Sequence, residues 1–69
     1  MKYGRGSQYY PLLRAMYTGE FRNNMRHGIG KFKSDTEEYW GFWKKDKRWG
    51  FGILEKGNEV IYEGNFVND

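Results

Sequence analysis

A pattern in which aromatic residues alternate around a central glycine occurs three times in this 69-residue chain. Its copies begin at Tyr17, Tyr39 and Tyr62, at intervals of 22 and 23 residues. The first two copies continue, after a short polar stretch, into a Gly-x-Gly sequence at residues 28–30 and 50–52. A short fixed period is typical of an array of one supersecondary unit, not of an ordinary globular core. We therefore expect a repeat architecture, of the kind that usually binds or scaffolds and rarely carries out chemistry by itself.

Each repeat has the alternation of a β-hairpin. In residues 17–22, aromatic residues or glycine alternate with polar residues, which indicates a strand with one aromatic face. Asn23 and Asn24 follow, and paired asparagines tolerate the positive φ of a tight hairpin turn. Residues 26–32 are then expected to form the return strand, where bare glycine backbone leaves room for rings from the neighbouring strand. No segment has a sustained helical period, so the sequence predicts an all-β fold.

The second repeat follows the same plan around a polar loop at residues 44–47. Ser34-Asp35 and Gly57-Asn58 have the composition of connections between hairpins. The positions expected to form the repeat core share the aromatic and glycine pattern: Tyr17, Gly19, Phe21, Gly28, Gly30, Tyr39, Gly41, Trp43, Gly50, Gly52, Tyr62, Gly64 and Phe66.

This combination of motifs resembles the MORN repeat (membrane occupation and recognition nexus). The resemblance rests on Tyr-x-Gly-x-Phe/Trp, a polar turn and x-Gly-x-Gly at a period near 23, and it covers the chain from about Tyr17 onward. It implies an elongated, single-layer antiparallel sheet of stacked β-hairpins. It also implies a protein-interaction or scaffolding role, with membrane or phosphoinositide association proposed for some members. The family often accompanies catalytic domains, and none is visible in this sequence.

Both ends of the chain match halves of the repeat. Residues 1–6 correspond position by position to residues 25–30, and residues 62–69 correspond to residues 17–24. We therefore divide one domain, 1–69, into a half repeat at 1–6, a connection at 7–16, repeats at 17–38 and 39–61, and a half repeat at 62–69. Open strand edges are templates for pairing. Three explanations stay open: a piece of a longer array, head-to-tail stacking of copies, or completion by another subunit.

The first connection, residues 7–16, is longer and more apolar than the others. One interpretation is a strand followed by a Pro-bearing loop that covers the sheet edge. The other is a segment that docks onto a partner.

The second repeat alone is apolar on both faces of its hairpin. Alternation places five of its residues opposite the core stripe: Trp40, Phe42, Trp49, Phe51 and Ile53. Their counterparts in the first repeat are mostly polar or charged: Thr18, Glu20, His27, Ile29 and Lys31. Clustered exposed aromatic residues indicate an interface, and Lys44, Lys45 and Lys47 lie beside them. The alternatives are that residues 9–13 or a strong sheet twist bury the aromatic residues, and that the lysines form an ordinary polar turn.

Composition argues against chemistry in this chain. It contains no cysteine and one histidine, so neither a disulfide nor a typical zinc site is expected. The repeat counterparts of His27 are Trp49 and Tyr3, which points to packing or a surface role. The carboxylates at residues 35–38 could act as acid and base only in a cleft that separates their pKa values, and a turn on a thin sheet offers no cleft. We expect no catalytic residue, cofactor or metal, and no apolar run approaches the roughly 20 residues that span a bilayer.

Charge and composition narrow the partners. Residues 1–33 carry a net charge of +6 and residues 34–69 one of −3. We expect binding to other protein subunits or to further copies of the chain, with a membrane surface as the alternative. The charge is too divided to favour nucleic acid. No secretory signal is visible, and the acid-free first sixteen residues weakly resemble a targeting composition. The location is therefore expected to be intracellular: cytoplasmic, cytoskeletal or organellar, mitochondria included.

Overall fold

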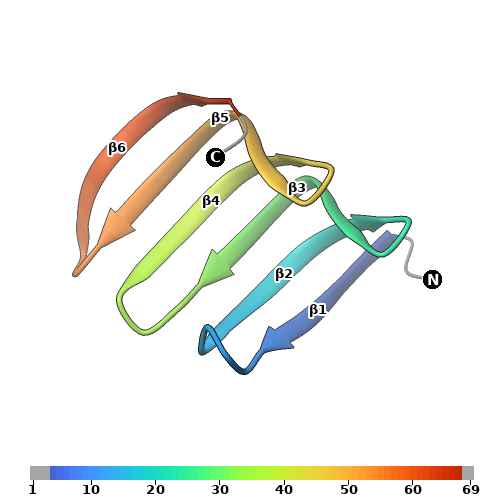
Figure 1. Ribbon diagram of the computed structural model, residues 1–69. Coiled ribbons are helices and arrows are strands. Elements are labelled where there is room, and N and C mark those ends of the chain that lie inside the picture. Colours follow the sequence, from blue (N-terminus) through green and yellow to red (C-terminus); the bar gives the residue numbers. More distant parts are fainter. Residues whose placement is uncertain (1–3, 68–69) are drawn as a thin grey trace.

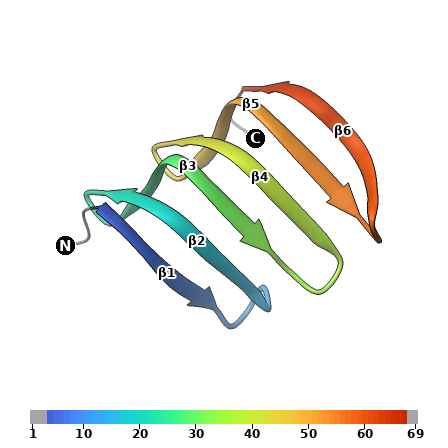
Figure 2. The ribbon, with the colours of Figure 1, turned by 180° about the vertical axis from the view of Figure 1, so that it is seen from behind.

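The computed structural model describes residues 4–67, and all its regular elements are strands (Figure 1). They are β1 (Gly4–Tyr10), β2 (Ala15–Arg22), β3 (Met25–Lys33), β4 (Glu37–Lys44), β5 (Lys47–Lys56) and β6 (Glu59–Phe66). The six strands form one sheet in chain order, each antiparallel to the next, and the view from behind shows the same order (Figure 2). The predicted all-β sheet of successive hairpins is confirmed. Within residues 4–67 there is no helix that could cross a membrane.

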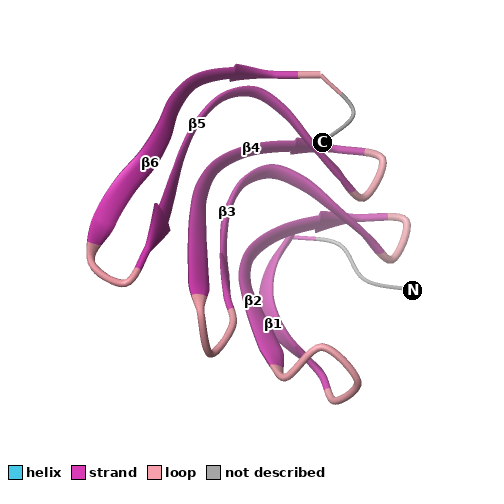
Figure 3. Ribbon diagram, turned by 60° about the vertical axis from the view of Figure 1, so that its left-hand side comes forward, coloured by secondary structure: helices cyan, strands magenta, loops and turns pink. Residues whose placement is uncertain are grey.

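A single sheet can bury side chains only where it curls around them. The strands bend over along their length, and the sheet forms an arch (Figure 3). Four aromatic residues on one face of this arch are buried: Tyr17, Phe21, Tyr39 and Trp43. We call this side the core face, and the opposite side the outer face.

Tight turns with positive φ join several of the strands. One of them is the predicted asparagine pair, and others lie where the sequence did not predict positive φ. Asn23 and Asn24 have φ of 53° and 65°, which confirms the predicted asparagine turn. The same left-handed pair recurs at Lys45 and Asp46, with φ of 50° and 70°, and at residues 57–58. Two successive residues with positive φ match the right-handed twist of a hairpin. The predicted polar loop at residues 44–47 is thus confirmed as a turn. Its left-handed pair was not predicted, because lysine rarely takes this conformation.

The second glycine of each Gly-x-Gly provides clearance for a ring. A Cβ atom on Gly30 would collide with the ring and hydroxyl of Tyr17, and one on Gly52 would collide with those of Tyr39. Because the backbone is bare, each tyrosine lies flat against the neighbouring strand and is almost completely buried, with exposed fractions of 0% and 2%. The expected role of glycine as clearance holds at these positions.

The first glycine of each Gly-x-Gly has a different role. Gly28 and Gly50 have φ of 67° and 78°, in the left-handed region that favours glycine. They lie in bulges, where three residues of the return strand face a single residue of the preceding strand. The expectation of ring clearance is therefore wrong at these two positions, because a β-bulge requires backbone freedom there.

Edge-to-face aromatic contacts run from repeat to repeat along the core face. The Tyr17 ring meets Trp43 of the next repeat at 5.4 Å, and Tyr39 meets Phe66 of the last half repeat at 5.0 Å. Within the second repeat, Tyr39 meets Trp43 at 5.1 Å. These are favourable geometries for aromatic pairs. Each repeat also satisfies its tyrosine hydroxyl, because Tyr17 donates to the Glu20 carbonyl at 2.8 Å and Tyr39 to the Phe42 carbonyl at 2.9 Å.

The N-terminal strand is longer than the half repeat assigned from the sequence. β1 continues to Tyr10, whose ring packs 5.8 Å from Phe32, and a turn at residues 11–14 leads into β2. The boundaries 1–6 and 7–16 thus differ from the observed elements, because residues 7–10 extend the pairing with β2. A strand followed by a Pro-bearing loop is the arrangement found. The predicted half repeats also include residues 1–3 and 68–69, which lie outside the described residues.

Replacing the clearance glycine tests the packing of tyrosine on backbone. Gly30→Ala forces a methyl group into the Tyr17 ring, and such overpacking costs about 1–3 kcal/mol of unfolding free energy. Gly6 holds the same place in the repeat, but a Cβ there would lie 3.7 Å from Phe21, an ordinary contact. Gly6→Ala should therefore change stability by less than about 0.5 kcal/mol. Urea unfolding in dilute solution measures both values, and equal losses would contradict this account of the packing.

Burial of Tyr17 also predicts a loss of stability at high pH. Desolvation raises the pKa of its hydroxyl to about 12, against about 10 in an unfolded chain. The unfolded state therefore loses this proton first, so stability falls as the pH rises from about 10 to about 12, by up to about 1.4 kcal/mol per pH unit. Urea unfolding across this range should show a shallower slope for Tyr17→Phe. Identical slopes for the two proteins would show that the Tyr17 pKa is not raised.

Candidate functional site

Four aromatic side chains of the second repeat lie exposed on the outer face. The exposed fractions are 49% for Trp40, 40% for Phe42, 46% for Trp49 and 45% for Phe51. We call this set the outer aromatic face. Trp40 and Phe42 alternate with the buried Tyr39, Gly41 and Trp43, so the pleat of β4 turns them away from the core. Trp49 and Phe51 lie on β5, on either side of Gly50.

Strand register brings the four rings together. Trp40 pairs with Ile53 of β5, and the bulge sets residues 49–51 opposite Phe42, so Trp49 and Phe51 lie beside it. Ile53 itself is half-buried. Residues 9–13 form the end of β1 and its turn, at the opposite edge of the sheet, and do not cover these rings. The alternative in which this segment buries the aromatic residues is therefore wrong.

The three predicted lysines lie at one end of this face. Lys44 and Lys47 are directly opposite each other in the β4–β5 pair, with Lys45 in the turn between them. The Lys44 ammonium group lies 4.9 Å from the centroid of the Trp49 ring. A shallow hollow of about 270 Å³ is lined by Lys44, Lys45, Lys47 and Trp49. Like charges directly opposite each other are unfavourable in a sheet, so this end of the hairpin is suited to an anionic contact.

The turn of the first repeat extends the same basic surface. A second hollow, of about 310 Å³, is lined by Arg22, Asn23, Met25, His27, Lys44 and Lys45. Sequence reasoning did not place Arg22 or His27 beside the lysines, although their shared position in the repeat could have suggested it. Within residues 4–67, no three His, Asp or Glu side chains lie close enough together to hold a metal ion.

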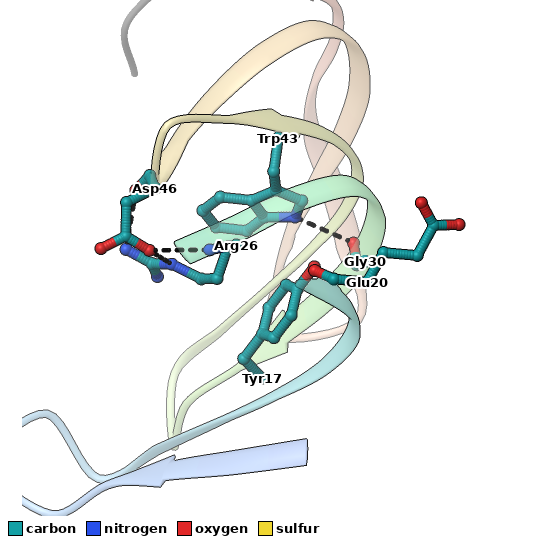
Figure 4. A network of polar contacts seen from close by, with 6 residues as sticks. All are labelled: Tyr17, Glu20, Arg26, Gly30, Trp43 and Asp46. Carbon is teal, nitrogen blue, oxygen red and sulfur yellow. Dashed lines mark hydrogen bonds and ion pairs between the residues drawn. The ribbon is translucent and has the colours of Figure 1, made fainter. Parts of the chain in front are cut away.

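An arginine cluster on the core face was also missed. The Arg26 guanidinium lies 4.6 Å from the centroid of Trp43 and 5.2 Å from that of Phe32. Its Nε atom donates to Asp46 Oδ1 at 2.7 Å, and a terminal nitrogen donates to the Asp46 carbonyl at 2.8 Å (Figure 4). Because Trp43 in turn donates from Nε1 to the Gly30 carbonyl at 3.1 Å, the cluster ties β3 to the β4–β5 turn.

The second repeat has an arginine at the same place. Arg48 lies 5.4 Å from the ring centroids of both Tyr39 and Phe66. Arg26 and Arg48 are 22 residues apart in the sequence, so the repeat period was the signal that could have found them. Between them the core face has a hollow of about 170 Å³, whose lining includes Arg26, Phe32, Tyr39, Trp43, Arg48 and Leu54.

The chain matches known proteins over both of its full repeats. The family model described as MORN repeat matches residues 17–36 and 39–59. Alsin from Mus musculus and from Homo sapiens is 31% identical over 73 residues, covering 97% of this chain. MORN repeat-containing protein 3 from Xenopus laevis is 42% identical over 61 residues, covering 77% of this chain. The chain spans only 4% of alsin and 26% of the Xenopus protein.

Removing Arg26 should destabilise the sheet more than removing an exposed arginine. Arg26→Ala loses the contact with the Trp43 ring and the charged hydrogen bonds to Asp46, at a cost of about 2–3 kcal/mol of unfolding free energy. Arg22→Ala, at an exposed position on β2, should cost less than about 0.5 kcal/mol. Urea unfolding measures both, and a loss for Arg26→Ala no larger than for Arg22→Ala would mean that the cluster does not stabilise the fold.

Proposed function

We propose that this chain, which belongs to the MORN repeat family, is a non-catalytic protein-interaction module whose contact surface is the outer aromatic face. The observation that carries the proposal is the exposure of Trp40, Phe42, Trp49 and Phe51, each 40% or more, on the face opposite the core. These four residues are not part of the buried core cluster, which includes Tyr39 and Trp43 on the opposite face.

The chemistry of the outer aromatic face suits a protein partner. Aromatic side chains bury about 150–250 Å² each and often dominate the binding energy of an interface. Here they stand on two paired strands, so little conformational entropy is lost when a partner covers them. The first repeat has Thr18 and Glu20 where the second has Trp40 and Phe42. The apolar outer face is therefore a property of one repeat and is not required by the sheet.

Such a surface fits a structural component of a larger assembly. The two outermost strands, β1 and β6, offer further contacts, because each pairs with only one other strand among the described residues. A partner could add a strand at either edge while the outer aromatic face supplies side-chain contacts. As part of this proposal, we place the chain inside the cell.

A pair of double variants tests the aromatic contact. Trp40→Ala with Trp49→Ala removes two exposed rings, and Leu12→Ala with Leu13→Ala removes two apolar side chains that are 99% and 62% exposed elsewhere. Immobilised wild-type chain and both variants are compared for the proteins that each retains from a cell extract, quantified by mass spectrometry. We expect the tryptophan variant to lose proteins that the leucine variant keeps. Identical retention by all three, with far-UV circular dichroism showing folded sheets, would contradict the proposal.

A membrane surface is the second candidate, favoured by the lysines at the end of the outer aromatic face. Lys44 and Lys47 oppose each other beside the exposed Trp49, an arrangement that anionic headgroups would stabilise. Sedimentation of the same three proteins with phosphatidylcholine vesicles, with and without phosphatidylserine, separates the candidates. Binding only to anionic vesicles, weakening with salt and reduced in the tryptophan variant, would favour the membrane over a protein partner.

A further inference from the structure

The outer face of the β4–β5 hairpin has a pair of like charges at each end. Lys44 lies directly opposite Lys47 beside the turn, and Glu38 lies directly opposite Glu55 at the other end of the same two strands. Glu38 and Lys44 alternate with the buried residues of β4, so both pairs are on the outer face. The outer aromatic face lies between the two pairs.

The first repeat has no such pairs. At the corresponding positions Arg22 lies opposite Met25, and Met16 lies opposite Lys33. Like charges directly opposite each other destabilise a sheet, so the second repeat breaks this rule twice, in the hairpin that also exposes the outer aromatic face. Natural sequences break such local rules mainly where a surface has a function besides folding.

The charges at both ends are only partly neutralised within the sheet. Glu38 contacts the Lys31 ammonium group at 3.2 Å. Among residues 4–67, Glu55, Lys44 and Lys47 form no salt bridge. Each end therefore retains charge that a partner of opposite sign would neutralise.

A hollow beside each pair carries the same sign of charge as the pair. The lysine end has a hollow of about 270 Å³, lined by three lysines and Trp49. The glutamate end has one of about 170 Å³, whose charged lining residues are Asp35, Glu37, Glu38, Glu55 and Lys33. The hairpin thus presents a basic hollow, a stretch of exposed rings and an acidic hollow, in that order.

The separation of the two pairs sets the length of a partner that contacts both. Glu38 and Lys44 are six positions apart in β4. A strand rises about 3.3 Å per residue, so the pairs are about 20 Å apart along the hairpin, which an extended segment of about seven residues spans. Alternate side chains of such a segment face the same way, so its first, third, fifth and seventh side chains would face the sheet.

The curvature of the sheet favours an extended segment over a helix. The outer face is the convex side of the arch (Figure 3). A straight helix along it would contact the rings in the middle and lose the charged pairs at the ends. An extended segment bends with the strands and keeps both contacts, and its backbone groups stay in contact with water at its sides.

We propose that the outer aromatic face binds an extended segment of a partner protein, with an acidic residue at one end, a basic residue at the other and apolar residues at the alternate positions between. The acidic side chain contacts Lys44 and Lys47. The apolar side chains cover Trp40 and the neighbouring rings, and the basic side chain contacts Glu38 and Glu55. The two charged contacts fix the direction in which the segment lies. The inference rests on the proposed function, because it names the class of partner for the same face.

Two synthetic peptides of the same composition test this charge pattern. Asp-Ser-Phe-Ser-Phe-Ser-Arg, the ordered peptide, has its charges on the side that carries the phenylalanines, and Ser-Asp-Phe-Ser-Phe-Arg-Ser, the control peptide, has them on the other side. Each has blocked ends and is titrated into the isotope-labelled 69-residue chain, followed by NMR. The ordered peptide should bind about three- to tenfold more tightly, since each exposed ion pair contributes modestly. Equal affinities, or no binding of the ordered peptide at millimolar concentration, would overturn the proposal.

Exchanging the charged pairs tests the direction of binding. The exchanged chain carries Lys44→Glu, Lys47→Glu, Glu38→Lys and Glu55→Lys, so it keeps the net charge and the two like-charge pairs of the wild type. A nitroxide label at the acidic end of the ordered peptide should broaden the NMR signals of residues 44–47 in the wild type, and those of residues 38 and 55 in the exchanged chain. The same pattern of broadening in both chains would contradict the proposed direction.

A smaller change gives an independent readout that does not depend on folding of the exchanged chain. Lys44→Glu with Lys47→Glu should abolish the preference for the ordered peptide. Arg5→Glu with Arg14→Glu makes the same change of charge at exposed positions on β1 and in the turn that follows it, and should keep the preference. A preference that survives in the lysine variant, or that disappears in both variants, would refute a specific contact with the lysine pair.

The outcome is separable from that of the proposed function. If Trp40→Ala with Trp49→Ala loses proteins from a cell extract while the wild type prefers neither peptide, the outer aromatic face remains an interface and only the charged ends fail. If the tryptophan variant keeps every protein, the proposed function itself fails. NMR signals of Trp40 and Trp49 that shift with the concentration of the chain alone would assign the face to a second copy, against the proposed segment.

Discussion

The fit of a tyrosine ring against bare glycine backbone is the contact on which the rest of this structure depends. Tyr17 lies on Gly30 and Tyr39 on Gly52, so close that a Cβ atom at either glycine would collide with the ring. A single-layer sheet has no second layer to cover its apolar side, so it must curl around its own rings. Large rings on one strand and absent side chains on the next make that curl possible.

The curl divides the sheet into faces with different tasks. The core face uses its aromatic rings for folding, and Arg26 secures it by joining the Trp43 ring to Asp46 of the following turn. The outer face contributes no side chain to the buried core cluster, so its composition can vary from repeat to repeat. In the second repeat it is aromatic, with Trp40 half-exposed. The same division explains why a chain with so few aliphatic residues can fold and still offer an apolar surface.

Much of this arrangement could be predicted because it follows from local patterns. The turn at Asn23 and Asn24 follows from residue types that accept positive φ, and the division into faces follows from strict alternation. A loop at residues 44–47 was also predicted, but the positive φ of Lys45 and Asp46 was not, because lysine rarely adopts it. The Arg26 cluster was missed for a related reason, since its partner is 20 residues away in the sequence.

The sequence by itself determined the period, the all-β class, the hairpin order and the faces on which the aromatic residues of the two full repeats lie. Those properties depend on spacing and on backbone preferences within a few residues. Only the tertiary structure decided how deeply each ring is buried. Tyr17, Tyr39 and Tyr62 occupy the same position in the repeat, yet the first two are buried and the third is exposed. Burial requires a neighbouring strand on both sides, and a repeat pattern does not say what lies beyond its last strand.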